Sequence, residues 1–178
     1  MRIQFFIAIS LVLASLVLPG LCQDPAPKRA PKNSVLLQKI EQKHPSNYIL
    51  VASNYFKNGQ KEQATFWYYL GQLRYRYYFL ANKETMSGTE DASLMSALFE
   101  TVGRPINEHA FGGLEQLREH IDAAITWDEE HENLFCSKQE NAKARQEVLE
   151  GLAALRQQTI DRADWIRTSR ERNGLENR

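Results

Sequence analysis

Acidic side chains that could act as general acids and bases are concentrated between residues 84 and 132. This stretch contains twelve Asp and Glu residues against two Arg. Paired carboxylates cleave glycosidic bonds, one as a general acid and the other as a base or nucleophile. The solvated surface of an acidic helix contains such pairs without any catalysis, and no motif selects one pair here. We therefore predict no catalytic residue and keep a cell-wall-acting, glycosidase-like enzyme as the alternative.

Three histidines, His109, His120 and His131, recur every eleven residues in or beside this stretch. Zinc sites on helices use histidine pairs spaced as H-x-x-x-H or H-E-x-x-H, and no such pair occurs here. The sequence also lacks a glycine-rich phosphate loop and a G-x-S-x-G nucleophile motif. We predict surface or helix-capping histidines, no metal and no cofactor.

Cys136 is the one cysteine left if an N-terminal signal peptide is removed, so no disulfide within the chain is expected. Its neighbours in the segment LFCSK form no motif that would activate a thiolate. A buried thiol is therefore favoured over an intermolecular link or a reactive group.

The sign of the charge changes along the chain. Residues 23–83 contain ten basic against three acidic residues, residues 84–132 two against twelve, and residues 133–178 nine against seven. An acidic surface can steer the encounter with a basic protein, although acidic and basic helices packed side by side explain the same pattern. Nucleic acid is a disfavoured partner, because part of the basic charge precedes the predicted domain and the chain has no net positive charge.

Residues suited to contact a partner protein fall in three places: the aromatic helix expected between the turn at Asn58–Gly59 and Leu80, the breaker-rich segment 103–113 and the acidic run after residue 127. They are Trp67, Tyr69, Arg74, Arg76, Arg104, His109, Asp128, Glu129, Glu130 and Glu132. Trp, Tyr and Arg are enriched at binding hot spots, and loops often carry recognition residues. The alternatives are structural. The arginine stems lie along aromatic rings with their heads on water or a carboxylate, and Ile106 and Phe111 fill the core from a connector.

The segment that follows the turn at Asn58–Gly59 and reaches Leu80 is expected to form the central helix, because its apolar positions recur with a 3.6-residue period. The apolar face carries Phe66, Leu70, Leu73, Tyr77 and Leu80, and further aromatic residues flank it on both sides. Other helices are expected from Ser34 to Pro45, from Pro45 to a turn at Asn58–Gly59, from Thr89 to Gly103, from Leu114 to Trp127 and from about Gln139 onward, with a loop or a short helical turn at 103–113. No segment alternates like a strand, so the expected fold class is all-α.

The helix–turn–helix segment from Pro45 to Leu80 resembles a known repeat unit. Its small and aromatic positions are Tyr48, Val51, Ala52, Tyr55, Gly59, Ala64, Tyr68 and Gly71. At these spacings the segment is similar to a single tetratricopeptide (TPR) or Sel1-like unit, in which small residues let two helices touch and aromatic residues fill the space between them. It differs from the family pattern at Arg76, where a proline usually ends the unit, and no second copy is visible. One unit cannot bury its own face, so we expect a compact helical bundle of about five to six helices built around a TPR-like hairpin.

The first 22 residues are typical of a secretory signal peptide: one Arg, an apolar run from Ile7 to Leu18 and a Pro-Gly break. The run is too short to favour a membrane-spanning helix, so no stable membrane span is expected after cleavage. Leu21 disfavours lipidation of Cys22, because a lipoprotein signal has a small residue just before the cysteine. The predicted organisation is a signal peptide at 1–22, a disordered Pro-rich linker at 23–33, a single α-helical domain at 34–170 and a flexible C-terminal tail at 171–178.

These observations predict an exported, non-enzymatic module that binds another protein. A periplasmic or secreted location follows from the predicted signal peptide. One concrete version is an immunity or inhibitor protein that blocks a toxin or an envelope hydrolase, and a periplasmic adaptor is equally compatible. The alternative class is the cell-wall enzyme acting through acidic residues.

Overall fold

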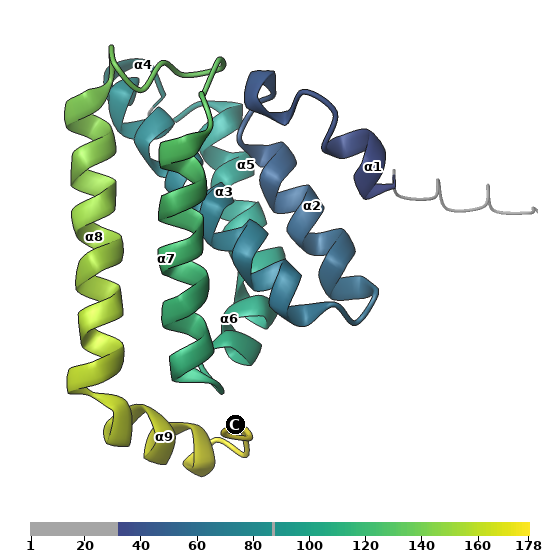
Figure 1. Cartoon of the computed structure of the whole chain (residues 1–178), viewed down its shortest axis with the longest axis vertical. Helices are drawn as coiled ribbons and strands as arrows, with labels where there is room; N and C mark the ends of the chain where they lie inside the picture. Colours follow the sequence, from purple (N-terminus) through teal and green to yellow (C-terminus); the bar gives the residue numbers. More distant parts are fainter. Residues whose placement is uncertain (1–31, 87) are drawn as a thin grey trace, which may run out of the picture.

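Helices account for the regular structure of the protein, and α3 lies among the others as their common neighbour (Figure 1). The computed structural model describes residues 32–86 and 88–178. In chain order the elements are α1 (Asn33–Leu36), the 3₁₀ turn η1 (Ile40–Gln42), α2 (Ser46–Lys57), α3 (Lys61–Ala81), α4 (Lys83–Met86), α5 (Glu90–Leu98), the π-helical turn η2 (Phe99–Gly103), α6 (Arg104–Ala110), α7 (Leu114–Glu130), α8 (Ala142–Asp161) and α9 (Ala163–Arg172). These described ranges contain no strand, which confirms the all-α fold class.

The aromatic helix α3 packs against α2, α6, α7 and α8. Figure 1 shows α7 and α8 side by side, α2 on the other side of α3, and α9 turning across one end of the molecule. Leu70, Leu73 and Tyr77 are fully buried, and Phe66 and Leu80 pack against the core while partly exposed. The apolar period of this segment therefore correctly predicted the central helix.

The helices α2 and α3 form a hairpin whose turn is the expected one. Gly59 has φ = +77°, a left-handed conformation that glycine adopts without a steric cost. Further along α3, a Cβ atom added to Gly71 would lie 2.5 Å from Cδ1 of Ile49, so the two helices touch at this glycine. The described residues show this helical hairpin but no evidence of a TPR or Sel1 repeat. The resemblance to that family remains a prediction.

The helix predicted from Ser34 to Pro45 is interrupted. It consists of α1 and η1, and Lys39 between them has φ = 52°. The break lets Leu36 and Ile40 both reach the core. The ammonium group of Lys43 donates to the carbonyl oxygens of Val35 and Leu36 at 3.0 and 2.9 Å, which satisfies the end of α1.

The segment 103–113 was predicted as a loop or a short helical turn, and the structure shows the helical form, with α6 longer than a single turn. α5 begins at the expected cap, where Thr89 Oγ1 accepts from the N–H of Ala92, and continues through η2 into α6. Gly103 does not end the helix: a Cβ there would collide with Tyr68, so glycine makes room for that ring. Pro105 lies in the first turn of α6, where proline loses no helical hydrogen bond. Ile106 is fully buried, as the structural alternative required.

The C-terminal part differs from prediction in two ways. The last predicted helix is divided at Arg162 into α8 and α9. The tail predicted to be flexible folds back on the bundle, where the N–H of Arg178 donates to the carbonyl oxygen of Gly112 at 2.6 Å. Arg170 holds both sides of this contact, since its guanidinium donates to the carbonyl oxygens of Glu108 and Glu176 at 2.8 and 2.7 Å.

The predicted signal peptide, 1–22, and the part of the linker before residue 32 lie outside the described residues. Asn33, assigned to the linker, begins α1. In the described part of the chain no helix combines the length and the apolar character needed to cross a membrane. Cys136 is a buried free thiol, as expected, and burial raises its pKa.

Candidate functional site

Arg74 and Asp128, both predicted to contact a partner, lie inside the protein. Their side chains are 1% and 0% exposed. Arg74 Nε donates to Asp128 Oδ1 at 2.8 Å, and Arg145 Nε donates to Oδ2 at 2.7 Å. The other N–H groups of Arg74 donate to Tyr48 Oη at 2.6 Å and to the carbonyl oxygen of His131 at 2.9 Å. This ion-pair network therefore joins α2, α3, α7 and α8.

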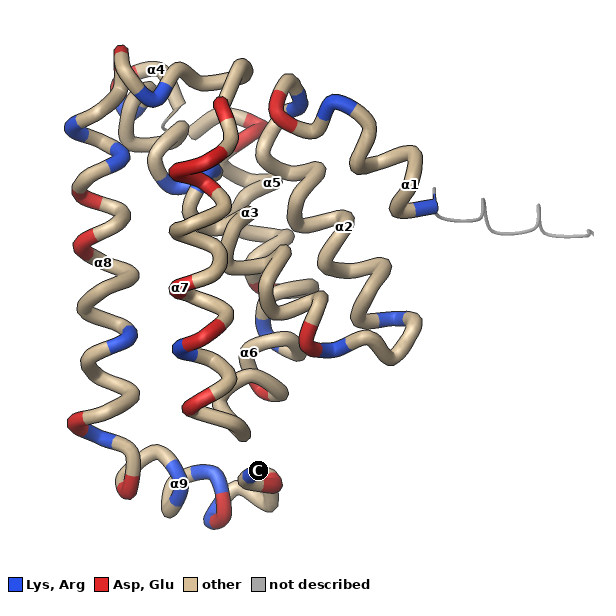
Figure 2. Tube along the Cα trace, viewed as in Figure 1, with Lys and Arg blue, Asp and Glu red and all other residues tan. Residues whose placement is uncertain are grey.

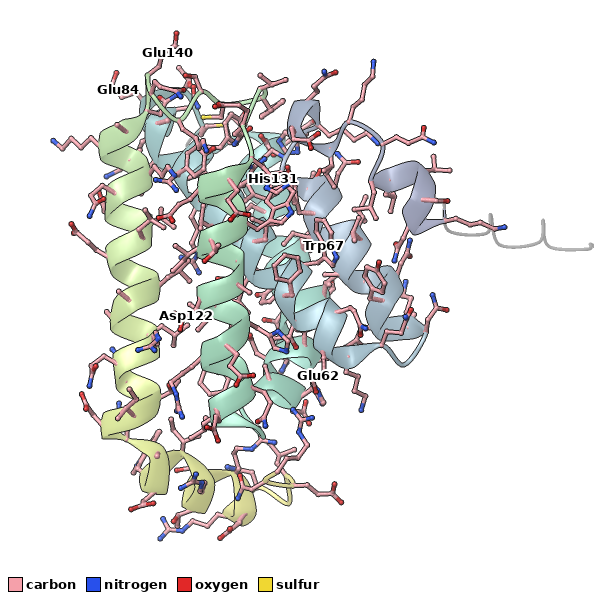
Figure 3. The ribbon with its side chains drawn as sticks, in the orientation of Figure 1. Glu62, Trp67, Glu84, Asp122, His131 and Glu140 are labelled. Carbon is pink, nitrogen blue, oxygen red and sulfur yellow. The ribbon has the colours of Figure 1, made fainter. Side chains whose placement is uncertain are left out.

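Aromatic rings complete the surroundings of the network. The Arg74 guanidinium lies 4.8 Å from the ring centre of Trp127, and Trp127 stacks on His131 at 3.9 Å. Figure 3 shows His131 and Trp67 on the side of α7 and α3 that faces α2. Burial raises the pKa of Tyr48 to about 12, so its phenol stays neutral. Arg74 and Asp128 thus stabilise the interior and do not face a partner, which corrects their assignment.

The remaining predicted residues are distributed over several surfaces. Tyr69 is buried and donates to Asn107 Oδ1 at 3.0 Å, while Trp67 is half-buried among aromatic rings. Arg76 and Arg104 are exposed on different helices, and Arg104 pairs with Glu100 at 2.9 Å. Only the acidic group at the end of α7 belongs to a larger exposed surface.

That surface combines acidic and apolar side chains at one end of the bundle, and we call it the acidic end surface. Its residues are Glu41, Glu90, Glu129, Glu130 and Glu132, together with Leu94, Leu134 and Phe135. Figure 2 shows acidic positions gathered at the end of α7 and beside the start of α5. Leu134 is 65% exposed, the highest exposure among the large hydrophobic side chains of the described residues. An exposed apolar pair bordered by carboxylates can bind an apolar pocket on a basic protein.

Hydrogen bonds fix the backbone of the loop that carries Leu134 and Phe135. The N–H groups of both residues donate to the carbonyl oxygen of Glu41 at 2.9 and 3.2 Å. Buried Asn133 accepts from the N–H groups of Phe135 and Cys136 at 3.2 and 3.1 Å. Because the backbone is already fixed by these bonds, binding through Leu134 would order few additional groups.

Lys138 stabilises the C-terminal end of α7, where the acidic run begins. The ammonium of Lys138 donates to the carbonyl oxygens of Asp128, Glu129 and His131 at 2.7, 3.2 and 3.0 Å. A cation at a helix C-terminus offsets the negative end of the helix dipole. The side-chain carboxylates of Glu129 and Glu130 have no ion pair within the described residues and stay exposed to solvent.

His44 lies next to the acidic end surface and connects the start of α2 with the start of α5. Its Nε2 lies 3.1 Å from Asp91 Oδ2, and Asp91 Oδ1 accepts from Tyr75 Oη at 2.5 Å. Its Nδ1 accepts from the N–H of Ser46 at 3.2 Å and lies 2.8 Å from Ser46 Oγ. The order Ser–His–Asp is that of a hydrolase triad, but the first-turn N–H groups of Ser46, Asn47 and Tyr48 all have protein acceptors. With those donors occupied, the arrangement caps α2 and ties it to α5.

A second polar cluster lies at the other end of the molecule, around Glu62 (Figure 3). Its two carboxylate oxygens lie 2.9 Å from Nε2 of His109 and 2.9 Å from Nε2 of His120. Arg178 Nη1 donates to the same carboxylate at 2.8 Å. Partial burial acts to raise the pKa of Glu62, but the hydrogen bonds from Arg178, His120 and His109 outweigh it and lower the pKa to about 2. For His109, burial outweighs its bond to Glu62 and lowers the pKa, which keeps the imidazole neutral at pH 7.

This cluster gives a pH-dependence prediction. Because the folded-state pKa of Glu62 is about 2 and its ordinary value is 4.5, its stabilisation is present above pH 4.5 and is lost as the pH falls towards 2. Glu62 is substantially exposed, so solvent screening limits the effect to roughly 1 kcal/mol or less. Urea unfolding at pH 5 and pH 2.5 should show a smaller loss of stability for Glu62→Gln than for the native chain. An equal loss in both chains would contradict the low pKa.

Across the described ranges, no group of three or more His, Cys, Asp and Glu side chains has an arrangement that could hold a metal ion. Comparisons with known proteins give no further assignment: no family model, no curated protein and no solved structure matches the chain. The acidic end surface is therefore assigned from its geometry alone. Leu134 and Phe135 come two positions after the acidic run that ends at Glu132. An apolar pair so close to an acidic run is the sequence feature from which these two residues could have been predicted as part of the surface.

Proposed function

We propose that the protein is an exported, non-enzymatic module that binds a basic partner protein through the acidic end surface. The observation that carries this proposal is Leu134, which is 65% exposed on a loop whose backbone is fixed by hydrogen bonds. An exposed apolar patch bordered by polar residues is typical of an interaction site, and a backbone that is already ordered lowers the entropic cost of binding. The predicted signal peptide supports a periplasmic or secreted location.

The carboxylates define the chemistry of the partner. Glu129, Glu130 and Glu132 are exposed beside the apolar pair, so a partner needs basic side chains around an apolar pocket. Such charges accelerate association at low salt and reject acidic proteins. An inhibitor or immunity protein for a toxin or envelope hydrolase suits this arrangement, and a periplasmic adaptor suits it equally.

The test is affinity capture from an envelope extract with matched variants, followed by mass spectrometry. A true partner should be captured in stoichiometric amount by the native chain and by Glu150→Lys, which reverses an exposed charge on α8 outside the surface. It should be depleted with Leu134→Ala and with the double variant Glu129→Lys, Glu130→Lys.

With the captured protein purified, the two variants should differ in kinetics. Leu134→Ala should raise the dissociation rate roughly tenfold, as expected for an anchor residue. The charge reversal should slow association roughly tenfold at low salt, with the difference shrinking as salt screens the charges. A captured set that is identical for native and variant chains would exclude this surface as the binding site.

A further inference from the structure

An apolar groove of about 530 Å³ lies between α3, α5 and α8, away from the residues of the acidic end surface. Its walls are aliphatic and aromatic side chains, namely Phe79, Leu80, Met95, Val148, Leu152 and Leu155. Leu155 also lines a second hollow of about 150 Å³ near α9. The two hollows share Leu155 on α8. The volume falls in the range of small-molecule sites.

Gly151 keeps the α8 wall of this groove open. Glycine is a weaker helix former than alanine, so a glycine inside a helix usually has a packing reason. Here nothing lies within 4 Å of the position that a Cβ atom would take. Gly151 is exposed and lines the groove, so a larger side chain at this position would take up space inside it.

The α5 wall is the least firmly packed side of the groove. None of the residues of α5 is buried, and Met95 reaches the core from a partly exposed position. Methionine has a flexible side chain that fits irregular apolar ligands. Rotation of the Met95 side chain can therefore adjust this wall to the thickness of a ligand.

Arg76 provides a positive charge at the rim. Its Nε donates to Gln72 Oε1 at 3.3 Å, and its guanidinium lies 5.2 Å from the ring centre of Phe99. Among the described residues it has no carboxylate partner, and Glu147 on the opposite rim forms no ion pair with it. The Nη groups therefore remain available for a carboxylate or phosphate, which Arg binds with two parallel hydrogen bonds.

We propose that the α3–α5–α8 groove binds a single-chain amphiphile with an anionic head group. The alkyl chain lies along α8 over Gly151 and Leu155, and the head group binds Arg76. This binding uses other residues than the contact with a partner protein, and neither proposal depends on the other.

The test is calorimetric titration of the purified chain with dodecyl amphiphiles below their micelle concentrations. Laurate should bind saturably with one molecule per chain. Dodecyltrimethylammonium, which has the same chain length and the opposite charge, should bind at least fivefold more weakly. Dodecyl phosphate is the third probe: preference for it over laurate indicates a phospholipid-derived ligand, and preference for laurate indicates a fatty acid.

Two variants locate the binding. Gly151→Leu fills the groove and should weaken laurate binding at least tenfold. Ala153→Leu adds the same side chain at an exposed position of α8 that does not line the groove, and it should have no effect. Arg76→Gln should weaken laurate roughly three- to tenfold and strengthen dodecyltrimethylammonium binding, because it removes a like charge beside that head group. Arg167→Gln, at an exposed arginine of α9, is its control.

Circular dichroism melting checks that each variant is folded. If Gly151→Leu does not fold, Gly151→Ala is the smaller change to test, and it should cause a smaller loss of laurate binding. Equal affinity for all three amphiphiles, or unchanged laurate binding in a folded Gly151→Leu chain, would overturn the proposal. The absence of saturable binding would also overturn it. If, in addition, the partner protein captured from an envelope extract were lost with Gly151→Leu, the groove would be a protein-docking site.

Discussion

Replacement of Asp128 by alanine is expected to lower the free energy of unfolding by about 3–5 kcal/mol. Asp128 is fully buried and accepts from Arg74 and Arg145. Without it, Arg74 keeps its charge in the interior and loses its counter-charge. The measurement is urea unfolding with linear extrapolation to water.

Asp122 supplies a matched control on the same helix. It pairs with Arg156 at 2.9 Å, and its side chain is 51% exposed. An exposed pair contributes at most about 1 kcal/mol, so Asp122→Ala should have a small effect. If the two variants lost equal stability, the ion-pair network around Asp128 would contribute no more to the fold than an exposed ion pair does.

A double variant separates the missing charge partner from general damage. In Asp128→Ala the large term is the unpaired guanidinium of Arg74, so Arg74→Met in the same chain removes that term. The double variant should be less destabilised than the sum of the single variants. Additive losses would show that the two residues act independently.

The second large effect is expected at Leu73, where truncation to alanine should cost about 2–5 kcal/mol. Leu73 is 0% exposed at the centre of α3, so the removed atoms leave a cavity that the surrounding helices fill only in part. Leu94 on α5 is 42% exposed, and the same substitution there should cost less than about 1 kcal/mol. A loss below about 0.5 kcal/mol at Leu73 would contradict its central position.

The binding predictions and the stability predictions test different parts of the molecule. Leu134, Glu129 and Glu130 are exposed, so their variants should fold like the native chain. Arg74 and Asp128 hold the interior, and a loss of partner binding in their variants would reflect loss of structure. Unfolding curves recorded beside each binding measurement distinguish the two causes.

Local sequence was sufficient where the physical cause is local. The turn at Asn58–Gly59 follows from a left-handed backbone that glycine accepts, and the start of α5 follows from the side-chain cap at Thr89. The burial of α3 follows from aromatic and aliphatic residues around nearly its whole circumference. In each case the deciding residues lie within a few turns of one another in the chain.

Tertiary structure decided the features that depend on distant residues. Arg74 and Asp128 are 54 positions apart. The local sequence allowed Arg74 a carboxylate partner, but it did not indicate that this partner is Asp128 or that both charges are buried. Gly103 and Pro105 belong to the breaker-rich segment 103–113, yet the chain there is helical. Tyr68 from α3 occupies the space that Gly103 leaves, and Pro105 lies in the first turn of α6. Whether an acidic or apolar residue is exposed depends on which helices cover it, and those contacts have no local pattern. The sequence therefore determined the helices and the central position of α3, and the packing of the helices determined which polar residues became structural ties and which formed the acidic end surface.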